Sequence, residues 1–287
     1  EQEEVTGLFS KDCILPCSFS PGHNEAIYWI KGKKTVHAYF KQEDQPKEQH
    51  ADYRGRTHLF HENIPSGNAS LKLSNLTVTD EGAYKCYVGT EQSKTTQEVM
   101  LHIKVSSYYA LEYQKTNRKR RLKCYAFLTY PAPHISWVRG SVSIQEIGRE
   151  ETRSGVLYSL RSDQNIVDTA DRYSCRVHLP HEEWAAEWMM QDKLSNTEGS
   201  STIIPCEYGN NTANTEVTCV WKLNRKSVTS LLASFNGTSR SYQPRAQINR
   251  SDFSLMLSDL SAADSGEYLC NISTRRYTKL IVRTLQV

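Results

Sequence analysis

The sequence predicts an all-β protein built from three sandwiches in tandem, and three observations support this. At 287 residues the chain is too long for one ordinary core and suits domains of roughly 100 residues each. Short stretches rich in Val, Ile, Tyr and Thr, such as "AIYWI" and "HISWV", alternate with turn clusters such as "SPGHNE" and "PSGN". One sequence segment also occurs twice in similar form. The first copy, "SLKLSNLTVTDEGAYKC", ends at Cys86, and the second, "SLMLSDLSAADSGEYLC", ends at Cys270.

Each predicted unit contains two cysteines, a tryptophan between them, and a tyrosine two residues before the second cysteine. In a sandwich of two sheets, a disulfide joins the sheets, the indole packs against it, and the tyrosine hydroxyl binds the backbone at a chain corner. This spacing is typical of immunoglobulin domains. The predicted disulfides are Cys17–Cys86, Cys124–Cys175 and Cys206–Cys270, with Trp29, Trp137 and Trp221 between them and Tyr84, Tyr173 and Tyr268 at the corners.

The distances between paired cysteines sort the domains by type. The cysteines are farther apart in the first and third units than in the second, which leaves room for the extra strand pair of a variable-type domain. The outer units also contain an Arg and an Asp at the positions that variable-type domains pair, whereas Thr169 replaces the Asp in the middle unit. These expected pairs are Arg56 with Asp80 and Arg245 with Asp264. The predicted domains are 1–105 (variable-type), 106–193 (constant-type) and 194–287 (variable-type).

The order of domain types, together with "GNASL", "DEGAYKCYVGT", "YPAPHISW", "SDFSLMLSDL" and "DSGEYLCNIS", resembles the B7 family of costimulatory and coinhibitory ligands. The resemblance implies a type I plasma-membrane protein that binds receptors on T cells and natural killer cells and modulates their activation. The expected partners are an immunoglobulin-superfamily costimulatory receptor and a killer-cell immunoglobulin-like receptor. The "YPAP" bend also resembles constant domains in which the equivalent of Tyr130–Pro131 is cis.

Cysteine and asparagine usage indicates a chain made in the secretory pathway. Eight cysteines accompany six Asn-x-Ser/Thr sequons, none of them in the middle domain. No apolar run is long enough to span a bilayer, and no leader pattern opens the chain. We therefore expect an extracellular ectodomain whose anchor lies outside this sequence. The predicted glycosylation sites are Asn68, Asn75, Asn210, Asn236, Asn249 and Asn271.

Charge and motif content argue against nucleic-acid binding and catalysis. Lys plus Arg is 35 against 32 for Asp plus Glu, a net charge of +3, far from the strongly basic balance of nucleic-acid binders. His178 and His181 superficially suggest metal ligands, but Pro180 breaks the helix that such a pair requires. Because nearly every cysteine is committed to a bridge and none lies in a nucleophile motif, we expect no enzyme, no metal and no cofactor. The run Arg118–Arg121 ("RKRR") is interpreted as a charged strand edge, with heparan sulfate binding or proteolysis as alternatives.

Two further segments leave alternatives open. Trp184 and Trp188 in "HEEWAAEWMMQDKL" lie four apart, which fits a helix, but the segment follows a cysteine-containing strand where a hairpin partner is due, so we predict a strand. Cys13 and Cys219 remain after the three bridges. Both are predicted to be buried free thiols, the alternative being an interdomain or intermolecular bridge.

The alternation of side chains in the first domain predicts a binding face. Trp29, Tyr84 and Cys86 point into the core, so their neighbours point outward onto the sheet that variable-type domains use for partners. The alternatives are that this face contacts the second domain or lies under glycans, and that the protein is a homophilic or heterophilic adhesion molecule. The predicted receptor-binding residues are Tyr28, Ile30, Val36, Ala38, Phe40, Lys85, Tyr87, Thr96, Glu98 and Met100.

Overall fold

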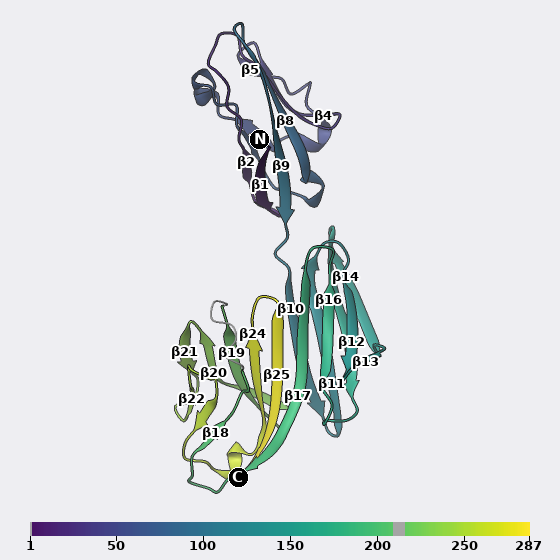
Figure 1. The fold of residues 1–287 in the computed structure, drawn as a ribbon, viewed down its shortest axis with the longest axis vertical. Helices are drawn as coiled ribbons and strands as arrows, with labels where there is room; N and C mark the ends of the chain where they lie inside the picture. Colours follow the sequence, from purple (N-terminus) through teal and green to yellow (C-terminus); the bar gives the residue numbers. More distant parts are fainter. Residues whose placement is uncertain (1, 209–215) are drawn as a thin grey trace. The chain divides into compact units, whose positions relative to one another are not determined.

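The computed structural model describes residues 2–208 and 216–287, and this part of the chain consists of strands with four short 3-10 helices (Figure 1). The all-β prediction is therefore confirmed. The predicted glycosylation site Asn210 lies outside the described residues. The chain divides into two compact units, residues 1–106 and residues 107–287.

The first unit is a sandwich of two sheets. The larger sheet contains, in spatial order, β1 (Glu3–Leu8), β9 (Lys94–Lys104), β8 (Gly82–Gly89), β3 (Ala26–Lys31), β4 (Lys34–Phe40) and β5 (Glu43–Asp44). The smaller sheet contains β2 (Cys13–Leu15), β7 (Leu71–Leu73) and β6 (Thr57–Leu59), with η1 (Ala51–Tyr53), η2 (His61–Ser66) and η3 (Val78–Asp80) in the connections. β1 runs parallel to β9, while the neighbouring pairs in the rest of both sheets are antiparallel.

The core of the first unit forms around Trp29 and the disulfide between Cys17 and Cys86. Trp29 is fully buried, and its indole N–H donates to the carbonyl oxygen of Ala69 at 2.9 Å. Because that donor is satisfied, the largest side chain of the core is buried without leaving a polar group unpaired. The disulfide joins the two sheets beside it, and the other two predicted disulfides, Cys124–Cys175 and Cys206–Cys270, are present as well.

A tyrosine and an ion pair hold the corner that leads into β8. The hydroxyl of Tyr84 donates to the main-chain carbonyl of Asp80 at 2.6 Å. Arg56 donates to both carboxylate oxygens of Asp80, at 2.8 and 2.9 Å. The third sandwich repeats this arrangement with Tyr268, Asp264 and Arg245. Both Arg–Asp pairs expected from the sequence are confirmed.

The second unit contains three sheets. A four-stranded sheet consists of β10 (Tyr108–Thr116), β11 (Lys119–Thr129), β15 (Leu157–Ile166) and β14 (Gly148–Ser154), and a three-stranded sheet of β18 (Thr202–Ile204), β23 (Leu255–Leu257) and β22 (Ala246–Ile248). Between them a nine-stranded sheet has the order β13 (Val142–Ile144), β12 (His134–Arg139), β16 (Tyr173–His178), β17 (Glu183–Ser195), β25 (Tyr277–Gln286), β24 (Gly266–Ser273), β19 (Thr218–Arg225), β20 (Val228–Asn236) and β21 (Thr238–Ser241). η4 (Ala262–Asp264) precedes β24. The peptide bond Tyr130–Pro131, which follows β11, is cis, as expected.

β17 joins the second and third sandwiches into one sheet. It pairs antiparallel with β16, where Trp188 faces Tyr173, and parallel with β25, where Trp188 faces Leu280. In Figure 1 this strand runs the length of the second unit beside β25. The strand predicted for "HEEWAAEWMMQDKL" is confirmed, and residue 194, where the third domain was expected to begin, lies within it.

The two faces of β24 and β25 are buried in two different cores. Side chains on one face, including Cys270 and Ile281, belong to the core of the third sandwich. Side chains on the other face, Leu269, Leu280 and Val282, belong to the core of the second sandwich, and β10 packs against β25. The front sheet of the third sandwich is therefore covered over these strands, because alternation sends every second residue into its neighbour.

A buried carboxylate ties the second and third sandwiches together. Glu267 in β24 is 4% exposed. It accepts hydrogen bonds from the Tyr113 hydroxyl at 2.9 Å, from Lys115 at 3.2 Å and from Arg120 at 2.9 Å. Two cations from the β10–β11 hairpin thus surround one acid, which compensates the cost of removing its charge from water.

The two cysteines outside the disulfides are free thiols. Cys219 is fully buried, and its sulfur lies 3.7 Å from the sulfur of Cys270. Cys13 is half-buried against the core of the first unit. Burial raises the pKa of the Cys219 thiol to about 12 and that of Cys13 to about 11, with nearby acidic side chains adding to the effect at Cys13. At neutral pH both thiols stay protonated and act as small apolar side chains.

Candidate functional site

The outward face of the larger sheet in the first unit carries a cluster of aromatic and apolar side chains. Tyr28 lies at its centre, paired with Ala38 on β4 and with Tyr87 on β8. The ring of Phe40 stacks against that of Tyr28, with 6.1 Å between the ring centroids. Tyr87 is 37% exposed, a large value for an aromatic residue in the middle of a sheet. The alternation of β3 and β8 therefore presents tyrosines to solvent, as expected.

Charged and polar residues border this cluster on β8 and β9. Lys85 pairs with Ile30 on one side and Glu98 on the other, and its ammonium lies 4.0 Å from the Glu98 carboxylate. Glu98 also accepts a hydrogen bond from the amide of Gln2 at 2.7 Å. Both charged side chains are more than one-third exposed, so their pairing adds little stability and leaves them available to a partner. Thr96, opposite Tyr87, and Met100 complete the face.

Val36 is a correction to the predicted face. It is fully buried and belongs to the core of the first unit, although alternation from Phe40 placed it outward. The reason is a β-bulge: Trp29 faces His37 while the next residue, Ile30, faces Thr35, so Val36 is an extra residue. The bulge reverses the phase of β4. Thr35 takes the outward position opposite Ile30, and the sequence analysis missed it.

Ala38 is also corrected, in exposure rather than in direction. It pairs with the outward residue Tyr28, but it is only 2% exposed. Its methyl group is too short to reach past larger neighbours such as Phe40 on the same face. The spacing of Val36 and Tyr39, three apart in "KTVHAYF" and both in the core, is the signal that identifies the bulge.

The repeated segment occupies the same place in the third sandwich, but its outward residues differ in solvent exposure from those of the first. On β8 the outward positions are Ala83, Lys85 and Tyr87; the corresponding residues on β24 are Glu267, Leu269 and Asn271. Glu267 and Leu269 are 4% and 7% exposed because they pack against the second sandwich. Lys85 and Tyr87 remain exposed. Of these two strands, only β8 presents this face to solvent.

The predicted glycosylation sites of the first unit flank the smaller sheet. Asn68 and Asn75 lie just before and just after β7, and Asn75 is exposed. The aromatic cluster is on the larger sheet, so these positions do not lie on it. Of the sites in the second unit that the structure describes, Asn236 is exposed, and Asn249 and Asn271 are half-buried.

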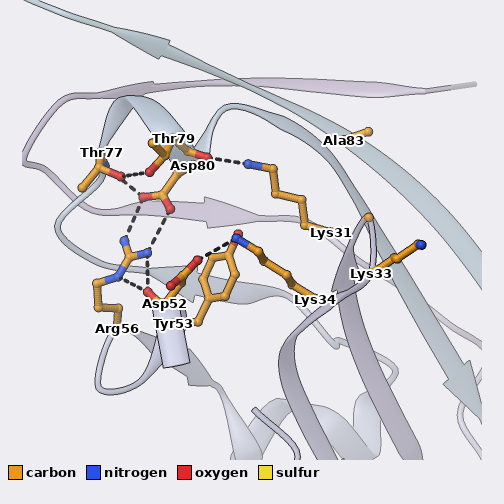
Figure 2. A pocket seen from close by; sticks show the side chains of 11 residues that line it. Lys31, Lys33, Lys34, Asp52, Tyr53, Arg56, Thr77, Thr79, Asp80 and Ala83 are labelled. Atoms are coloured by element: carbon orange, nitrogen blue, oxygen red, sulfur yellow. Dashed lines mark hydrogen bonds and ion pairs between the residues drawn. The ribbon is translucent and has the colours of Figure 1, made fainter. Parts of the chain in front are cut away.

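A cavity of about 730 Å³ in the first unit lies beside the Arg56–Asp80 pair (Figure 2). Lys34 donates to Asp52 at 2.7 Å, and Lys31 donates to the carbonyl oxygen of Thr79 at 2.6 Å. Burial alone would raise the pKa of Asp80, but its hydrogen bonds with Arg56 and Thr77 outweigh that effect and lower it. Figure 2 shows these groups bonded to one another, which is the arrangement of a structural network.

The histidines that superficially suggested metal binding do not form a metal site with other ligands in the described residues. His178 lies 3.9 Å from Glu183 at the end of the β16–β17 hairpin, on the surface. Within residues 2–208 and 216–287, no group of three or more His, Cys, Asp or Glu side chains has a geometry that holds a metal ion. In the same residues, no helix is long and apolar enough to cross a membrane.

Comparisons with known proteins agree with this fold. The model of the immunoglobulin V-set domain matches residues 1–106 and 190–285. Human HERV-H LTR-associating protein 2 is 34% identical over all of this chain and 72% of its own length. The CD276 antigen homolog of Xenopus laevis is 28% identical over 61% of this chain and 62% of its own length. Rat V-set domain-containing T-cell activation inhibitor 1 is 31% identical over 46% of this chain and 48% of its own length.

These matches define first a class, the immunoglobulin superfamily with two V-set segments, and then a family within it. The chain belongs to the B7 family of immune ligands. It is accordingly a non-enzymatic protein. In its first V-set segment Lys85 and Tyr87 of β8 face solvent, whereas β24 of the second segment packs against the middle sandwich.

Proposed function

We propose that this chain is the ectodomain of a cell-surface ligand that binds receptors on T cells and natural killer cells and modulates their activation. The binding surface is the front face of the first domain, formed by Tyr28, Ile30, Thr35, Phe40, Lys85, Tyr87, Thr96, Glu98 and Met100. The observation that carries the proposal is that β8 exposes Tyr87 and Lys85, whereas Leu269, the equivalent of Lys85 on β24, is buried against the second sandwich.

The composition of this face supports a protein partner. Tyrosine and methionine are enriched at the centres of protein interfaces, and charged residues at their rims. Tyr28, Phe40 and Tyr87 supply the apolar centre, and Lys85 with Glu98 supplies the rim. Rigid aromatic side chains on a sheet lose little conformational entropy when they bind, which makes them effective anchors.

The remaining sequence-based expectations form part of the same proposal. The three domains are 1–105, 106–193 and 194–287, and the protein is held at the plasma membrane as a type I protein through a segment outside this sequence. N-linked glycans on Asn68, Asn75, Asn210, Asn236, Asn249 and Asn271 keep the outer domains soluble and leave the front face of the first domain uncovered.

The proposal is tested with the intact chain as a fluorescent tetramer, titrated on sorted T cells and natural killer cells. Tyr28→Ala and Tyr87→Ala should each cost roughly 2 kcal/mol of binding, about thirtyfold in Kd, because each removes an aromatic anchor. The matched control is Ile14→Ala, which removes an exposed apolar side chain from the smaller sheet of the same domain and should leave binding unchanged.

Normal staining by both tyrosine variants, with thermal unfolding like the parent, would exclude this face as the receptor site. Sedimentation of the unlabelled chain distinguishes a receptor ligand from an adhesion molecule by its oligomeric state. A ligand stays monomeric at low micromolar concentration, whereas an adhesion molecule that pairs through its first domains dimerises.

A further inference from the structure

A second cavity, of about 650 Å³, lies in the second unit between the β10–β11 turn and the β19–β20 turn. It brings together three basic segments that are far apart in sequence. Lys115 comes from β10 and Lys193 from the end of β17. Arg225 is the last residue of β19, and Lys226 lies in the turn that follows it. We call these four residues and the space between them the basic cleft. Its volume is within the range of ordinary ligand sites.

The positive charge of the basic cleft is not balanced by nearby acids. Glu267 is the one acidic side chain that lines it, and this group is already shared by Lys115 and Arg120. Lys193 donates to the amide oxygen of Gln286, and Arg225 donates to a backbone carbonyl at 2.9 Å. Among the described residues, no carboxylate lies within ion-pair distance of Lys193, Arg225 or Lys226.

The "RKRR" run divides its four residues between two roles. Arg120 points toward Glu267 and serves the joint between the sandwiches. Arg118 lies in the turn next to Asn117, which lines the basic cleft, and it is exposed. In the part of the chain that the structure describes, Arg118 takes part in no ion pair. Besides forming a charged strand edge, the run thus carries an exposed cation one residue away from the lining of the cleft.

We propose that the basic cleft binds a sulfated glycosaminoglycan. Cations that lack acidic partners and surround a concave site attract a polyanion, and release of its counterions adds to the binding free energy. Guanidinium groups such as those of Arg118 and Arg225 match the geometry of a multi-oxygen anion. The disulfides place the chain in an oxidising, extracellular setting, where sulfated glycans rather than nucleic acids are the abundant polyanions.

The test is elution of the intact glycosylated chain from immobilised heparin in a salt gradient, with Kd measured in solution against a heparin oligosaccharide. The variant Arg118→Glu/Lys193→Glu/Lys226→Glu should bind at least about tenfold more weakly at physiological salt, with a shallower salt dependence. The control Lys11→Glu/Lys47→Glu/Lys94→Glu changes the net charge equally at exposed positions in the first unit. It should stay within about twofold of the parent.

No retention of the parent, equal elution of the cleft variant and the parent, or an equal loss in the control variant would overturn the proposal. Binding to vesicles that contain phosphatidylserine, without binding to heparin, would also overturn it. Unchanged thermal unfolding of the cleft variant excludes misfolding as the cause of weaker binding. Tyr87→Ala should elute like the parent, which separates this site from the receptor face.

Discussion

Single side chains decide whether a repeated sheet face is exposed to solvent or forms an internal joint. On β8 the outward residues Lys85 and Tyr87 leave the sheet exposed, whereas Glu267 and Leu269 on β24 lie against the second sandwich. The core residues of the two strands are the same types, so the scaffold does not account for the difference. A buried acid needs partners, and Lys115 and Arg120 supply them.

At this scale we expect Glu267→Gln to destabilise the second unit by roughly 3 kcal/mol, because Lys115 and Arg120 lose their shared counter-charge in a buried site. Urea unfolding followed by near-UV circular dichroism measures the change. Glu98→Gln, which removes an exposed acid from the first unit, is the control and should change stability by less than about 0.5 kcal/mol. Equal stability of the two variants would show that the Glu267 cluster contributes nothing net.

At the scale of elements, the corner before β8 and the corner before β24 have the same design. A short helical turn positions an Asp whose carboxylate accepts from an Arg on a distant loop, while the Tyr hydroxyl binds the main-chain carbonyl of that Asp. Burial would raise the pKa of each Asp, but the hydrogen bonds lower it below the ordinary value of 3.8. The ionised form is therefore the one that stabilises the folded state.

The sign of the pH dependence follows from this. Because the folded-state pKa of Asp80 is depressed, its contribution is complete at neutral pH and is lost as the pH falls below 3.8 and through the folded-state pKa. Asp80→Asn should cost about 2 kcal/mol at pH 7 and progressively less in acid. Thermal unfolding from pH 7 to pH 3 tests this prediction. A constant difference between parent and variant across that range would contradict it.

At the scale of the whole chain, the second and third sandwiches share a sheet and part of a core. β17 pairs with β16 on one side and β25 on the other, and Leu269, Leu280 and Val282 of the third sandwich are buried in the second. Elements that share a core lose their contacts together. We therefore expect residues 107–287 to unfold as one cooperative unit.

The variant Leu160→Ala tests this coupling, because Leu160 is a buried residue of the second sandwich. It should cost about 2–5 kcal/mol and should lower amide-exchange protection in β24 as much as in β16. Protection in β8 should not change. Leu71→Ala in the first unit is the matched control and should affect β8 alone. Full protection of β24 in the Leu160→Ala protein would show that the third sandwich is independently stable.

The sequence by itself determined the features that depend on the spacing of cysteine, tryptophan and tyrosine and on the alternation of side chains along a strand. Cysteine, tryptophan and tyrosine spacing identified the three disulfides and their cores, and period-two alternation placed Tyr28, Lys85 and Tyr87 outward. These predictions succeeded because each residue type has few places in a sandwich that satisfy it. The resemblance to the B7 family added the expectation of a receptor face.

Only the tertiary structure decided the features that depend on contacts between distant segments. A bulge in β4 buried Val36, because an extra residue in one strand changes the phase of everything beyond it. Packing of β10 against β25 covered β24 and β25 in the front sheet of the third sandwich, and the approach of the β10–β11 hairpin to the β19–β20 turn brought Lys226 to the same cavity as Lys115. No local sequence pattern encodes these long-range contacts, because they depend on how whole sheets pack against one another.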